Sequence, residues 1–378
     1  MRKDNAISYL KIQLPFKVSC PVLALGSQTK NTLCLLKGRS AYISPIHPSL
    51  DELTDLLSFE RDARRLLRFH PKIIACDLHP GYQSTRFAAL FNSRYKIVPV
   101  QHHHAHIASC MLENNLKNQK VIGVAFDGTG LGQDNRVWGA EFLLCDYRSY
   151  LRQAYLKEMP LLGGEKAILE PWRLACFWLY QIYGEDTLGL KIDFIKKIPQ
   201  KKWETLRKLY RSGFDFPLAS SMGRLFDAAA ALVLSLTTAR FEAELAVRLE
   251  QTAGRWKGKA RSYPFRILNS KGRLVIDPSY TIQEIVSDLK ARRQKEEIAY
   301  QFHLTLAEII LKICLKLKRK YGINKVVLSG GVFQNSLLLT NTIKRLTDKG
   351  FLVFNHKKLV CSDSSLSLGQ AVVAYFGS

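Results

Sequence analysis

Four of the nine histidines of this chain lie within five positions, in the stretch VPVQHHHAH (98–106). Two of them, His102 and His106, are four residues apart, so on a helix their imidazoles project from the same face. Two imidazoles on one face suit a metal ion that takes its remaining ligands from elsewhere in the fold. The alternative is a surface cluster of histidines without a ligand. The spacing therefore makes His102 and His106 candidate metal ligands.

The residues on either side of the histidines predict a strand followed by a helix. YKIVPVQ (95–101) is a short apolar run of strand length, and HAHIASCMLENNL (104–116) has helical character. The histidines are thus expected at a strand-to-helix junction. In open α/β sheets ligands bind at the carboxyl ends of the strands, which is where this junction would lie.

A glycine-rich turn, FDGTGLGQD (126–134), offers a carboxylate at the end of another expected strand. Asp127 is placed to bind a metal directly or through water. Gly128, Gly130 and Gly132 are expected to tolerate positive φ and to let backbone amides approach phosphate oxygens. An ordinary hairpin turn is the alternative for this stretch.

Two further motifs complete a possible site. In LSGGVFQN (328–335), Gly330 and Gly331 separate a buried strand from a helix start, which leaves room for a base or ribose and directs helix N–H groups at an anion. In CSDSSLSLGQ (361–370), Asp363 precedes the final helix and is either a helix-entry residue or a further metal ligand. The sequence contains no G-x-S-x-G and no Walker A loop. An enzyme built from these parts would polarise a carbonyl or phosphoryl group with a metal and would need an external nucleophile.

The expected strands and helices occur in a similar order twice along the chain. Strand-like runs in 21–45 precede a strand–helix–strand–helix series up to residue 116, and a hairpin over 121–147 precedes a similar series from 325 to 376. This order predicts an α/β protein with a duplicated actin-like ATPase fold and a nucleotide and metal cleft between two lobes. We expect the first lobe in residues 1–118 and the second in 119–378, with a helical insertion at about 165–255.

Composition narrows the class of protein. The chain has 378 residues, 47% of them hydrophobic, which is enough for a sizeable core. No apolar run reaches the about 20 residues of a membrane span, and the N-terminal MRKDNAISYLKIQLPF has neither a continuous apolar segment nor a small-residue cleavage site. None of the eight cysteines forms a C-x-x-C pair. These features are typical of a reduced, cytoplasmic protein without a membrane segment.

The net charge of +24 would favour association with an acidic partner, such as nucleic acid or an acidic protein surface. The basic residues concentrate in three stretches, at 196–211, 255–266 and 312–320, and aromatic residues interleave the first two, as in single-strand nucleic-acid binders. No recognised nucleic-acid motif accompanies them. We therefore favour solvated basic faces and do not expect a nucleic-acid partner.

Several longer stretches carry a resemblance to a known family. They are KNT (30–32), CDLHPGYQSTRFA (76–88), VQHHHAHIASCM (100–111), FDGTGLG, WGAEF, GGEKAILEPWRLA (163–175), SSMGRLFDAAAAL (220–232), AYQFHLTLA (299–307), LSGGVFQNSLL and SLGQAV. Together they resemble the C-terminal domain of the HypF carbamoyltransferases, which is related to the tRNA threonylcarbamoyltransferase TsaD. The resemblance spans about residues 20–376.

The resemblance implies an activity and its cofactors. In that family a YrdC-like domain makes carbamoyl-adenylate from carbamoyl phosphate and ATP. The TsaD-like domain then passes the carbamoyl group to the C-terminal cysteine of HypE, on the way to the cyanide ligand of [NiFe] hydrogenase. A divalent metal, zinc or iron, and ATP or carbamoyl-AMP are the implied cofactors. A HypE-like acceptor and a YrdC-like protein are the implied partners.

The resemblance also assigns roles to residues of this chain. The implied metal ligands are His102, His106, Asp127 and Asp363, of which the first three are the implied catalytic residues. The implied cofactor-binding residues are Gly128, Gly130, Asp227, Glu242, Gly330, Gly331 and Asn335, with Asp227 facing the ribose and the two adjacent glycines facing the adenosine.

This sequence departs from the family pattern in several places. The usual DGGISLGQ is DSSLSLGQ, so Ser364 and Ser365 replace two glycines and are expected to crowd the phosphates or restrict φ. The usual YEGQAA is FEAELA (241–246), which keeps Glu242 but introduces Ala243 and brings the charge of Glu244 toward a nucleotide. The usual SQHIGDLE is SPIHPSLDE (44–52). The sequence shows none of the acylphosphatase-like, zinc-binding and YrdC-like domains that the family has upstream. We therefore expect either that a separate chain supplies carbamoyl-adenylate or that the domain has been reassigned.

Some alternatives stay open at this point. The chain could be a catalytically degenerate scaffold that binds nucleotide and metal, an O-carbamoyltransferase, or a tRNA-modifying enzyme similar to TsaD. Asp77 and His79 are expected to organise a turn ahead of the next helix. Trp172 and Arg173 are expected with equal weight to be packing residues or substrate contacts. For His303 we favour a core histidine with satisfied hydrogen bonds.

Overall fold

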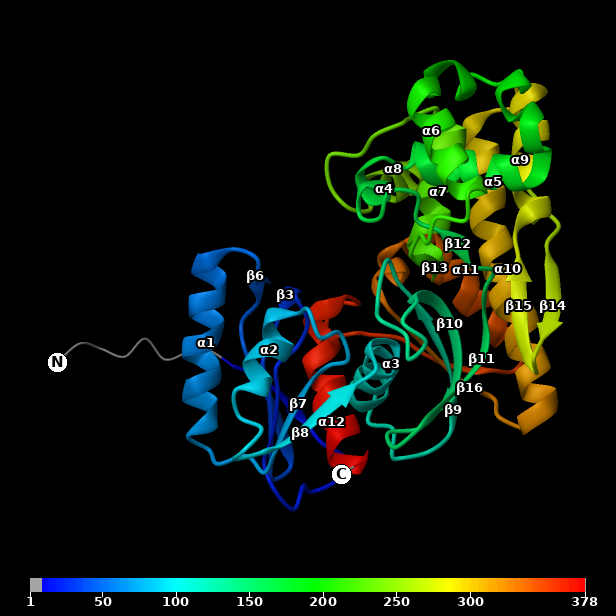
Figure 1. Ribbon diagram of the computed structural model, residues 1–378. Helices are drawn as coiled ribbons and strands as arrows, with labels where there is room; N and C mark the ends of the chain where they lie inside the picture. Colours follow the sequence, from blue (N-terminus) through cyan, green and yellow to red (C-terminus); the bar gives the residue numbers. More distant parts are fainter. Residues whose placement is uncertain (1–8, 378) are drawn as a thin grey trace.

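The computed structural model describes residues 9–377, and two β-sheets organise them (Figure 1). Residues 1–8, which belong to the N-terminal stretch considered for a secretion signal, lie outside the described residues. The first sheet has the strand order β1-β5-β4-β2-β7-β8. Its strands are β1 (Leu10–Gln13), β2 (Val22–Ala24), β4 (Cys34–Lys37), β5 (Ser40–Ile43), β7 (Ile73–Asp77) and β8 (Lys96–Val100). The short strands β3 (Thr29–Asn31) and β6 (His47–Ser49) pair separately.

The second sheet has the strand order β14-β15-β11-β10-β9-β16-β17, with β12 and β13 attached beside β10. Its strands are β9 (Val121–Phe126), β10 (Val137–Cys145), β11 (Tyr150–Leu156), β12 (Met159–Pro160), β13 (Leu218–Ser221), β14 (Arg266–Ser270), β15 (Arg273–Asp277), β16 (Lys325–Ser329) and β17 (Leu352–Phe354). All six residues of β9 are buried, as expected for a central strand covered on both faces.

The two sheets repeat one topology. In the first, β2 pairs antiparallel with β4 and β4 with β5, while β7 and β8 follow in parallel on the other side. In the second, β9, β10 and β11 make the same antiparallel series, and β16 and β17 follow in parallel. The prediction of a duplicated α/β fold is therefore confirmed.

Two helices lie between the sheets, and each packs against the sheet that it does not follow in sequence. Helix α3 (His102–Glu113) follows β8 of the first sheet but packs against β9, β10 and β16 of the second. Helix α12 (Leu366–Gly377) ends the chain but packs against β2, β4 and β7 of the first sheet, and the two helices contact each other along their length. Figure 1 shows α3 and α12 side by side in the middle of the molecule. Their buried residues and the facing residues of both sheets form one hydrophobic cluster. The predicted division at residue 118/119 remains a proposal.

The remaining helices cover the outer faces. Helices α1 (Leu53–Leu67) and α2 (Gln83–Ala89) lie on the outer side of the first sheet. Between β12 and β14 the chain forms α4 (Lys166–Leu169), α5 (Trp172–Tyr183), α6 (Gln200–Arg211), α7 (Met222–Leu234) and α8 (Glu244–Ala253). Helices α9 (Ser279–Lys290), α10 (Lys295–Tyr321) and α11 (Ser336–Thr347) follow β15 along the chain, with β16 between α10 and α11 in sequence. Figure 1 shows α4–α9 gathered at the top of the view, above the second sheet.

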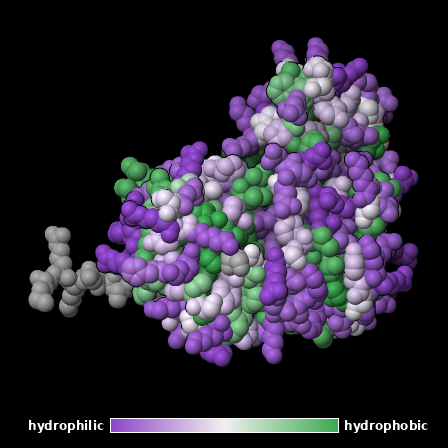
Figure 2. Space-filling model, turned by 60° about the horizontal axis from the view of Figure 1, so that its bottom comes forward, coloured by the Kyte–Doolittle hydropathy of each residue, from purple (hydrophilic) through white to green (hydrophobic). Residues whose placement is uncertain are grey.

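Helix α10 is long and apolar enough, by composition, to cross a membrane. However, 78% of its apolar window is buried inside the protein, where residues such as Phe302, Ile309 and Ile310 belong to the core of the second sheet. Such burial is the pattern of a core helix. In Figure 2 hydrophilic residues cover most of the visible face, and hydrophobic residues form small separate areas.

Local structure differs from the sequence predictions at a few elements. Helix α3 begins at His102, two residues earlier than predicted, because the side chain of Gln101 accepts a hydrogen bond from the backbone N–H of His104 and caps the helix. All four clustered histidines therefore lie inside the helix. Strand β11 was not predicted, because charged and polar residues such as Arg152 and Gln153 interrupt its apolar alternation.

Candidate metal and nucleotide site

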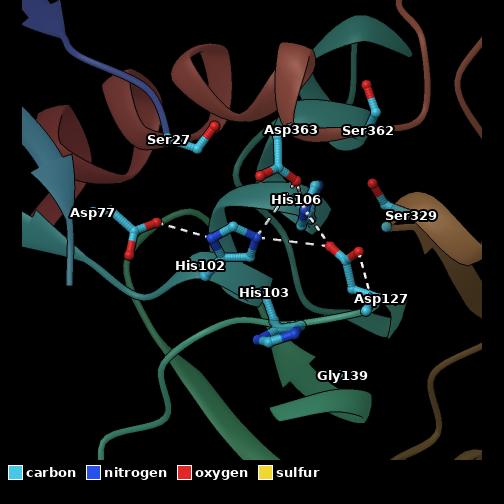
Figure 3. Close-up of polar contacts among 12 residues, drawn as sticks. Ser27, Asp77, His102, His103, His106, Asp127, Gly139, Ser329, Ser362 and Asp363 are labelled. Atoms are coloured by element: carbon cyan, nitrogen blue, oxygen red, sulfur yellow. Dashed lines mark hydrogen bonds and ion pairs between the residues drawn. The ribbon is translucent and has the colours of Figure 1, made fainter. Parts of the chain in front are cut away.

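Four side chains from three places in the chain converge between the two sheets (Figure 3). They are His102, His106, Asp127 and Asp363, and their candidate ligand atoms all lie within 4.8 Å of one another. The Nε2 atom of His106 lies 2.8 Å from Oδ2 of Asp127 and 3.6 Å from Oδ1 of Asp363. The Nε2 atom of His102 lies 3.7 Å from each of the same two oxygens. The structure thus brings together the four residues that the sequence nominated as metal ligands.

Each of these side chains is placed by an element of the fold. His102 and His106 occupy successive turns of α3, and their ring centroids are 4.9 Å apart. Asp127 directly follows β9, and its backbone N–H donates to the carbonyl of Gly139 in β10. Asp363 opens the 3-10 turn η4 (Asp363–Ser365) immediately before α12. Helix α3 therefore carries two of the candidate ligands, and α12 directly follows the turn that contains a third.

Asp77, which the sequence assigned to a turn, contacts the site directly. Its Oδ2 atom accepts a hydrogen bond from Nδ1 of His102 at 2.8 Å, and both side chains are fully buried. Its other oxygen accepts from the backbone N–H of His79, so the expected turn is also present. This contact leaves Nε2 of His102 facing Asp127 and Asp363 (Figure 3). A carboxylate behind a metal-binding imidazole is a common arrangement, because it fixes the orientation of the ring.

The buried charges hold one another in their ionised forms. Burial alone lowers the pKa of His102, but the carboxylates of Asp77, Asp127 and Asp363 raise it well above its usual value. The pKa of His106 is also raised, because contacts with Asp127 and Asp363 outweigh its burial. Conversely, the two imidazoles overcome burial and keep the pKa values of Asp127 and Asp363 below their usual range. Protons therefore occupy the histidines when no cation is bound.

The geometry of these groups fits a divalent cation. The Nε2 atoms of both histidines and Oδ2 of Asp127 are buried and form no aligned hydrogen bond, although the atoms are close enough. Atoms that converge on one point without pointing at each other are typical of ligands around a shared ion. Two imidazoles and two carboxylates are a donor set that zinc and iron both accept.

The other two histidines of the cluster are bonded elsewhere. Nε2 of His104 lies 2.6 Å from the carbonyl oxygen of Asp146, and burial lowers its pKa to about 4. Nδ1 of His103 lies 3.1 Å from the amide nitrogen of Gln101, and burial together with the charge of His102 lowers its pKa well below the usual value. His103 and His104 are therefore structural neighbours of the candidate metal-binding pair.

The glycines of the turn after Asp127 are closely packed by neighbouring side chains. None of Gly128, Gly130 and Gly132 has a positive φ. Instead, an added Cβ atom would lie 2.8 Å from the carboxylate of Glu242 at Gly128, 2.5 Å from the ring of His103 at Gly130 and 2.1 Å from the indole of Trp138 at Gly132. These glycines do not use their tolerance of positive φ, and close packing of side chains explains the lack of a Cβ atom at each. The approach of their backbone amides to phosphate oxygens stays a prediction.

The diglycine turn comes directly against Asp127. Gly330 has a φ of +98°, and an added Cβ atom would lie 2.3 Å from the carbonyl oxygen of Phe126. A Cβ atom at Gly331 would lie 3.1 Å from Oδ1 of Asp127. The turn that the sequence nominated for adenosine therefore touches a candidate metal ligand.

A second polar cluster lies beside Gly128. The guanidinium of Arg224 lies 3.1 Å from Asp227 and 3.1 Å from Glu242, while Arg224 and Asp227 are both buried. Burial and the charge of Glu242 outweigh the attraction of Arg224 and raise the pKa of Asp227 to about 6. The sequence nominated Asp227 and Glu242 but missed Arg224, although it stands in the same GRLFDA motif.

The side chain of Asn335 is engaged within the protein. Its oxygen accepts from the backbone N–H of Leu338 and caps α11, and its amide donates to Nε2 of His303 at 2.9 Å. Nδ1 of His303 bonds to the carbonyl of Ala299, which makes His303 the satisfied core histidine that was favoured. Trp172 is buried in the core, and Arg173 bonds to Glu170 and to the carbonyl of Leu162.

The serines at the departure from DGGISLGQ fit the local backbone. Neither Ser364 nor Ser365 has a positive φ. The hydroxyl of Ser364 lies 2.9 Å from that of Ser362, and the hydroxyl of Ser365 donates to the Ser362 carbonyl. Both side chains are thus bonded back to the residue that precedes Asp363, and the expected restriction on φ does not arise.

The stretch FEAELA (241–246), which replaces the usual YEGQAA, contains one residue with a strained backbone and one residue whose charge is paired. Ala243 has a φ of +64°, a left-handed conformation that favours glycine, at the start of α8. The carboxylate of Glu244 pairs with Arg240, which precedes the helix, and with Arg248 of α8, so its charge is compensated locally. The Ala243 backbone therefore carries strain next to Glu242.

Comparisons with known proteins agree with this architecture. Residues 17–113 match the family model described as the HypF Kae1-like domain, and residues 123–370 match the carbamoyltransferase, Kae1-like domain, second subdomain. The chain is 33% identical to the carbamoyltransferase HypF of Synechocystis sp. over 98% of its own length and 49% of the relative's. It is 33% identical to a carbamoyltransferase HypF homolog of Cupriavidus necator over 94% of its own length and 91% of the relative's.

A solved structure shows the same fold. A full-length HypF in its phosphate- and nucleotide-bound form superposes with a TM-score of 0.90 and 38% identity, covering 97% of this chain and 56% of that one. The chain spans about half the length of most of the curated relatives it matches. The match to the Cupriavidus necator homolog nevertheless extends over nearly the whole of both chains.

Proposed function

Because this chain belongs to the HypF carbamoyltransferase family, we propose that it transfers a carbamoyl group from carbamoyl-adenylate to the C-terminal cysteine thiol of a HypE-like protein in [NiFe] hydrogenase maturation, with release of AMP. The observation that carries the proposal is the convergence of His102, His106, Asp127 and the partly exposed Asp363, with Asp127 directly beside the diglycine turn. This arrangement would bring a bound cation next to a bound nucleotide.

The four converging side chains would hold a divalent cation, zinc or iron. When bound, the cation supplies charge that polarises a carbamoyl carbonyl and neutralises phosphate oxygens. Asp77 orients the imidazole of His102, and the close packing of Gly128 and Gly130 keeps the turn after Asp127 against the site. The nucleophile is the acceptor's thiol, which is consistent with a site built only from ligands and backbone turns.

The nucleotide is proposed to lie along the diglycine turn and the Arg224 cluster. Gly331 is partly exposed and has no side chain beside Asp127, which would let a nucleoside approach the candidate metal ligands, while the buried Gly330 packs against the backbone of Phe126. Asp227 and Glu242 would contact the ribose side, with Arg224 fixing both carboxylates. Asn335 would act by capping α11, whose N-terminus follows the diglycine turn.

The partners follow from the chemistry. Carbamoyl-adenylate would be supplied by a YrdC-like protein or domain, and the reaction would take place in the cytoplasm, where a cysteine acceptor stays reduced. Nucleic acid is not part of the proposal.

The test is direct transfer. The metal-loaded chain is incubated with carbamoyl-adenylate and a HypE-like tail that ends in cysteine, and the tail is analysed by mass spectrometry. We expect one added carbamoyl group on the cysteine, none on a tail that ends in serine, and none with His106→Ala. An unmodified cysteine tail beside intact carbamoyl-adenylate would contradict the proposal. Modification of the serine tail would identify an O-carbamoyltransferase instead.

A further inference from the structure

Three buried side chains form a continuous chain of contacts from the end of α3 to the diglycine turn. Oε2 of Glu113, the last residue of α3, lies 2.5 Å from Nδ1 of His356. Nε2 of His356 lies 3.0 Å from the hydroxyl of Ser329. The side chains of Glu113 and His356 are each only 2% exposed, and Ser329 is fully buried. None of the three belongs to the site described above.

Glu113 also attaches a loop to the end of α3. Its second oxygen, Oε1, accepts hydrogen bonds from three successive backbone N–H groups, those of Lys357, Lys358 and Leu359. Burial acts to raise the pKa of Glu113, but the bonds from His356 and from these backbone groups lower it to about 2. The carboxylate therefore stays charged at neutral pH and binds the loop strongly.

The attached loop leads to a candidate metal ligand. Residues 355–362 connect β17 to η4 and contain no helix or strand, so side-chain contacts determine their path. Glu113 holds the beginning of the loop, and near its end the thiol of Cys361 donates to the carbonyl of Gly330 at 3.2 Å. Asp363 follows at once. The end of α3 is thus connected to Asp363, while the start of α3 carries His102 and His106.

At its other end, this series of side-chain contacts reaches the diglycine turn through Ser329. Ser329 is the last residue of β16 and pairs with Ala125, two residues before Asp127. Gly330, next in sequence, is pressed against the backbone of Phe126. Figure 3 shows Ser329 on the same side of the site as Asp127 and Ser362. A shift of Ser329 would therefore move the turn that touches Asp127.

We propose that Glu113 and His356 are positioning residues, which fix the distance between the two histidine ligands and Asp363, and that Ser329 extends this constraint to the diglycine turn. Breaking the contacts of Glu113 and breaking the contact of Ser329 have different consequences. Loss of the Glu113 charge releases the loop before Asp363 and weakens metal binding. Loss of the Ser329 hydroxyl releases the diglycine turn and weakens nucleotide binding. The inference rests on the proposed metal and nucleotide site.

The experiment measures both affinities by calorimetry, with Zn²⁺ and then ATP as the probes, together with the midpoint of thermal unfolding. Glu113→Gln keeps the shape of the side chain but removes its charge, and Ser329→Ala removes one hydroxyl. Tyr263→Phe is the matched control, because it removes a buried hydrogen bond of 2.8 Å to Asp288 that belongs to α9 and its surroundings.

We expect Glu113→Gln to weaken Zn²⁺ binding about tenfold, as for other groups that hold metal ligands in place. Ser329→Ala should weaken ATP binding about fivefold, the effect of one lost hydrogen bond, and should leave Zn²⁺ affinity within about twofold of the wild type. Tyr263→Phe should lower the unfolding temperature without changing either affinity. If Glu113→Gln does not fold, His356→Gln takes its place with the same expected loss of Zn²⁺ affinity.

Two outcomes would overturn the inference and can be told apart. If the wild type binds Zn²⁺ and ATP and the Glu113, His356 and Ser329 variants bind them equally well, the three residues are merely structural. If the wild type binds neither probe, the proposed function itself fails, and the positioning role fails with it.

Discussion

The carboxylate of Asp77 lies 2.8 Å from Nδ1 of His102, and this contact decides which nitrogen of the imidazole faces Asp127 and Asp363. The two residues are 25 positions apart and belong to different elements, the end of β7 and the start of α3. A residue that the sequence assigned to a turn is therefore part of the support for the candidate metal site.

Asp77→Asn should weaken metal binding by about 10- to 100-fold, because an amide can present its N–H group to the ring and stabilise the wrong tautomer of His102. Titration with Zn²⁺ against a competing chelator measures the effect. Asp62→Asn is a suitable control, since Asp62 is also a buried aspartate near a histidine, His47, but lies in α1 away from the site. Equal losses in both variants would contradict a specific role for Asp77.

Metal affinity should increase with pH. The pKa values of His102 and His106 are raised by the surrounding carboxylates, so both imidazoles hold protons in the cation-free protein at pH 6.5. A metal must displace these protons, and it binds more tightly as their concentration falls. The Zn²⁺ dissociation constant measured from pH 6 to pH 8 should therefore decrease steadily, with protons released to the buffer. A constant affinity and no proton release would contradict the assigned protonation.

The same raised pKa values affect the stability of the cation-free protein. Histidines whose pKa is higher in the folded state stabilise it fully below about pH 6.5, the value in the unfolded chain, and this contribution is lost as the pH rises through the folded-state values. Urea unfolding without metal should therefore show a decrease in stability at alkaline pH that is smaller in His106→Ala. An identical pH dependence in the two proteins would rule out this contribution from His106.

Asp227 should show the opposite behaviour from an ordinary carboxylate. Its pKa is raised from 3.8 to about 6, so the folded protein binds a proton there that the unfolded chain does not bind between these values. The folded state is then favoured as the pH falls, and between pH 7 and pH 5 the wild type should gain about 1 kcal/mol relative to Asp227→Asn. Urea unfolding of both proteins at the two pH values measures this difference. A difference of opposite sign would show that Arg224 keeps the carboxylate ionised.

Ala243→Gly should stabilise the protein. Ala243 has a φ of +64°, where glycine is free of strain, so the free energy of unfolding should rise by about 0.5–1 kcal/mol after the greater freedom of glycine in the unfolded chain is included. Ala246→Gly is the control on the same helix, and it should destabilise by about 1 kcal/mol because Ala246 lies in the helix interior. Destabilisation by both changes would contradict strain at Ala243.

Gly331→Ala should separate site geometry from folding. The added methyl group lies 3.1 Å from Oδ1 of Asp127, and the φ of Gly331 is acceptable for alanine, so the protein should fold while metal affinity falls. At Gly330, where φ is +98° and a Cβ atom would press on Phe126, alanine should instead lower stability. Thermal unfolding and Zn²⁺ titration of both variants make the comparison. Unchanged affinity in Gly331→Ala would show that the turn does not bear on Asp127.

Local patterns in the sequence predicted the repeated sheets and the four converging side chains, because strand runs, the i,i+4 histidine pair and carboxylates at strand ends are short-range signals. The support around them was not predictable in the same way. Asp77 with His102, Glu113 with His356 and Arg224 with Glu242 meet only after folding, and the second pair is separated by 243 residues. The start of α3 was placed too late because a glutamine side chain serves as its cap.

Binding of ATP to the zinc-loaded protein, measured by calorimetry, tests the central claim most directly when the wild type is compared with His106→Ala and His104→Ala. Both histidines are buried in α3, but only His106 belongs to the converging set. We predict zinc-dependent ATP binding in the wild type and in His104→Ala, and its loss in His106→Ala. ATP binding that is independent of zinc, or that survives in His106→Ala, would contradict a joint metal and nucleotide site between the two sheets.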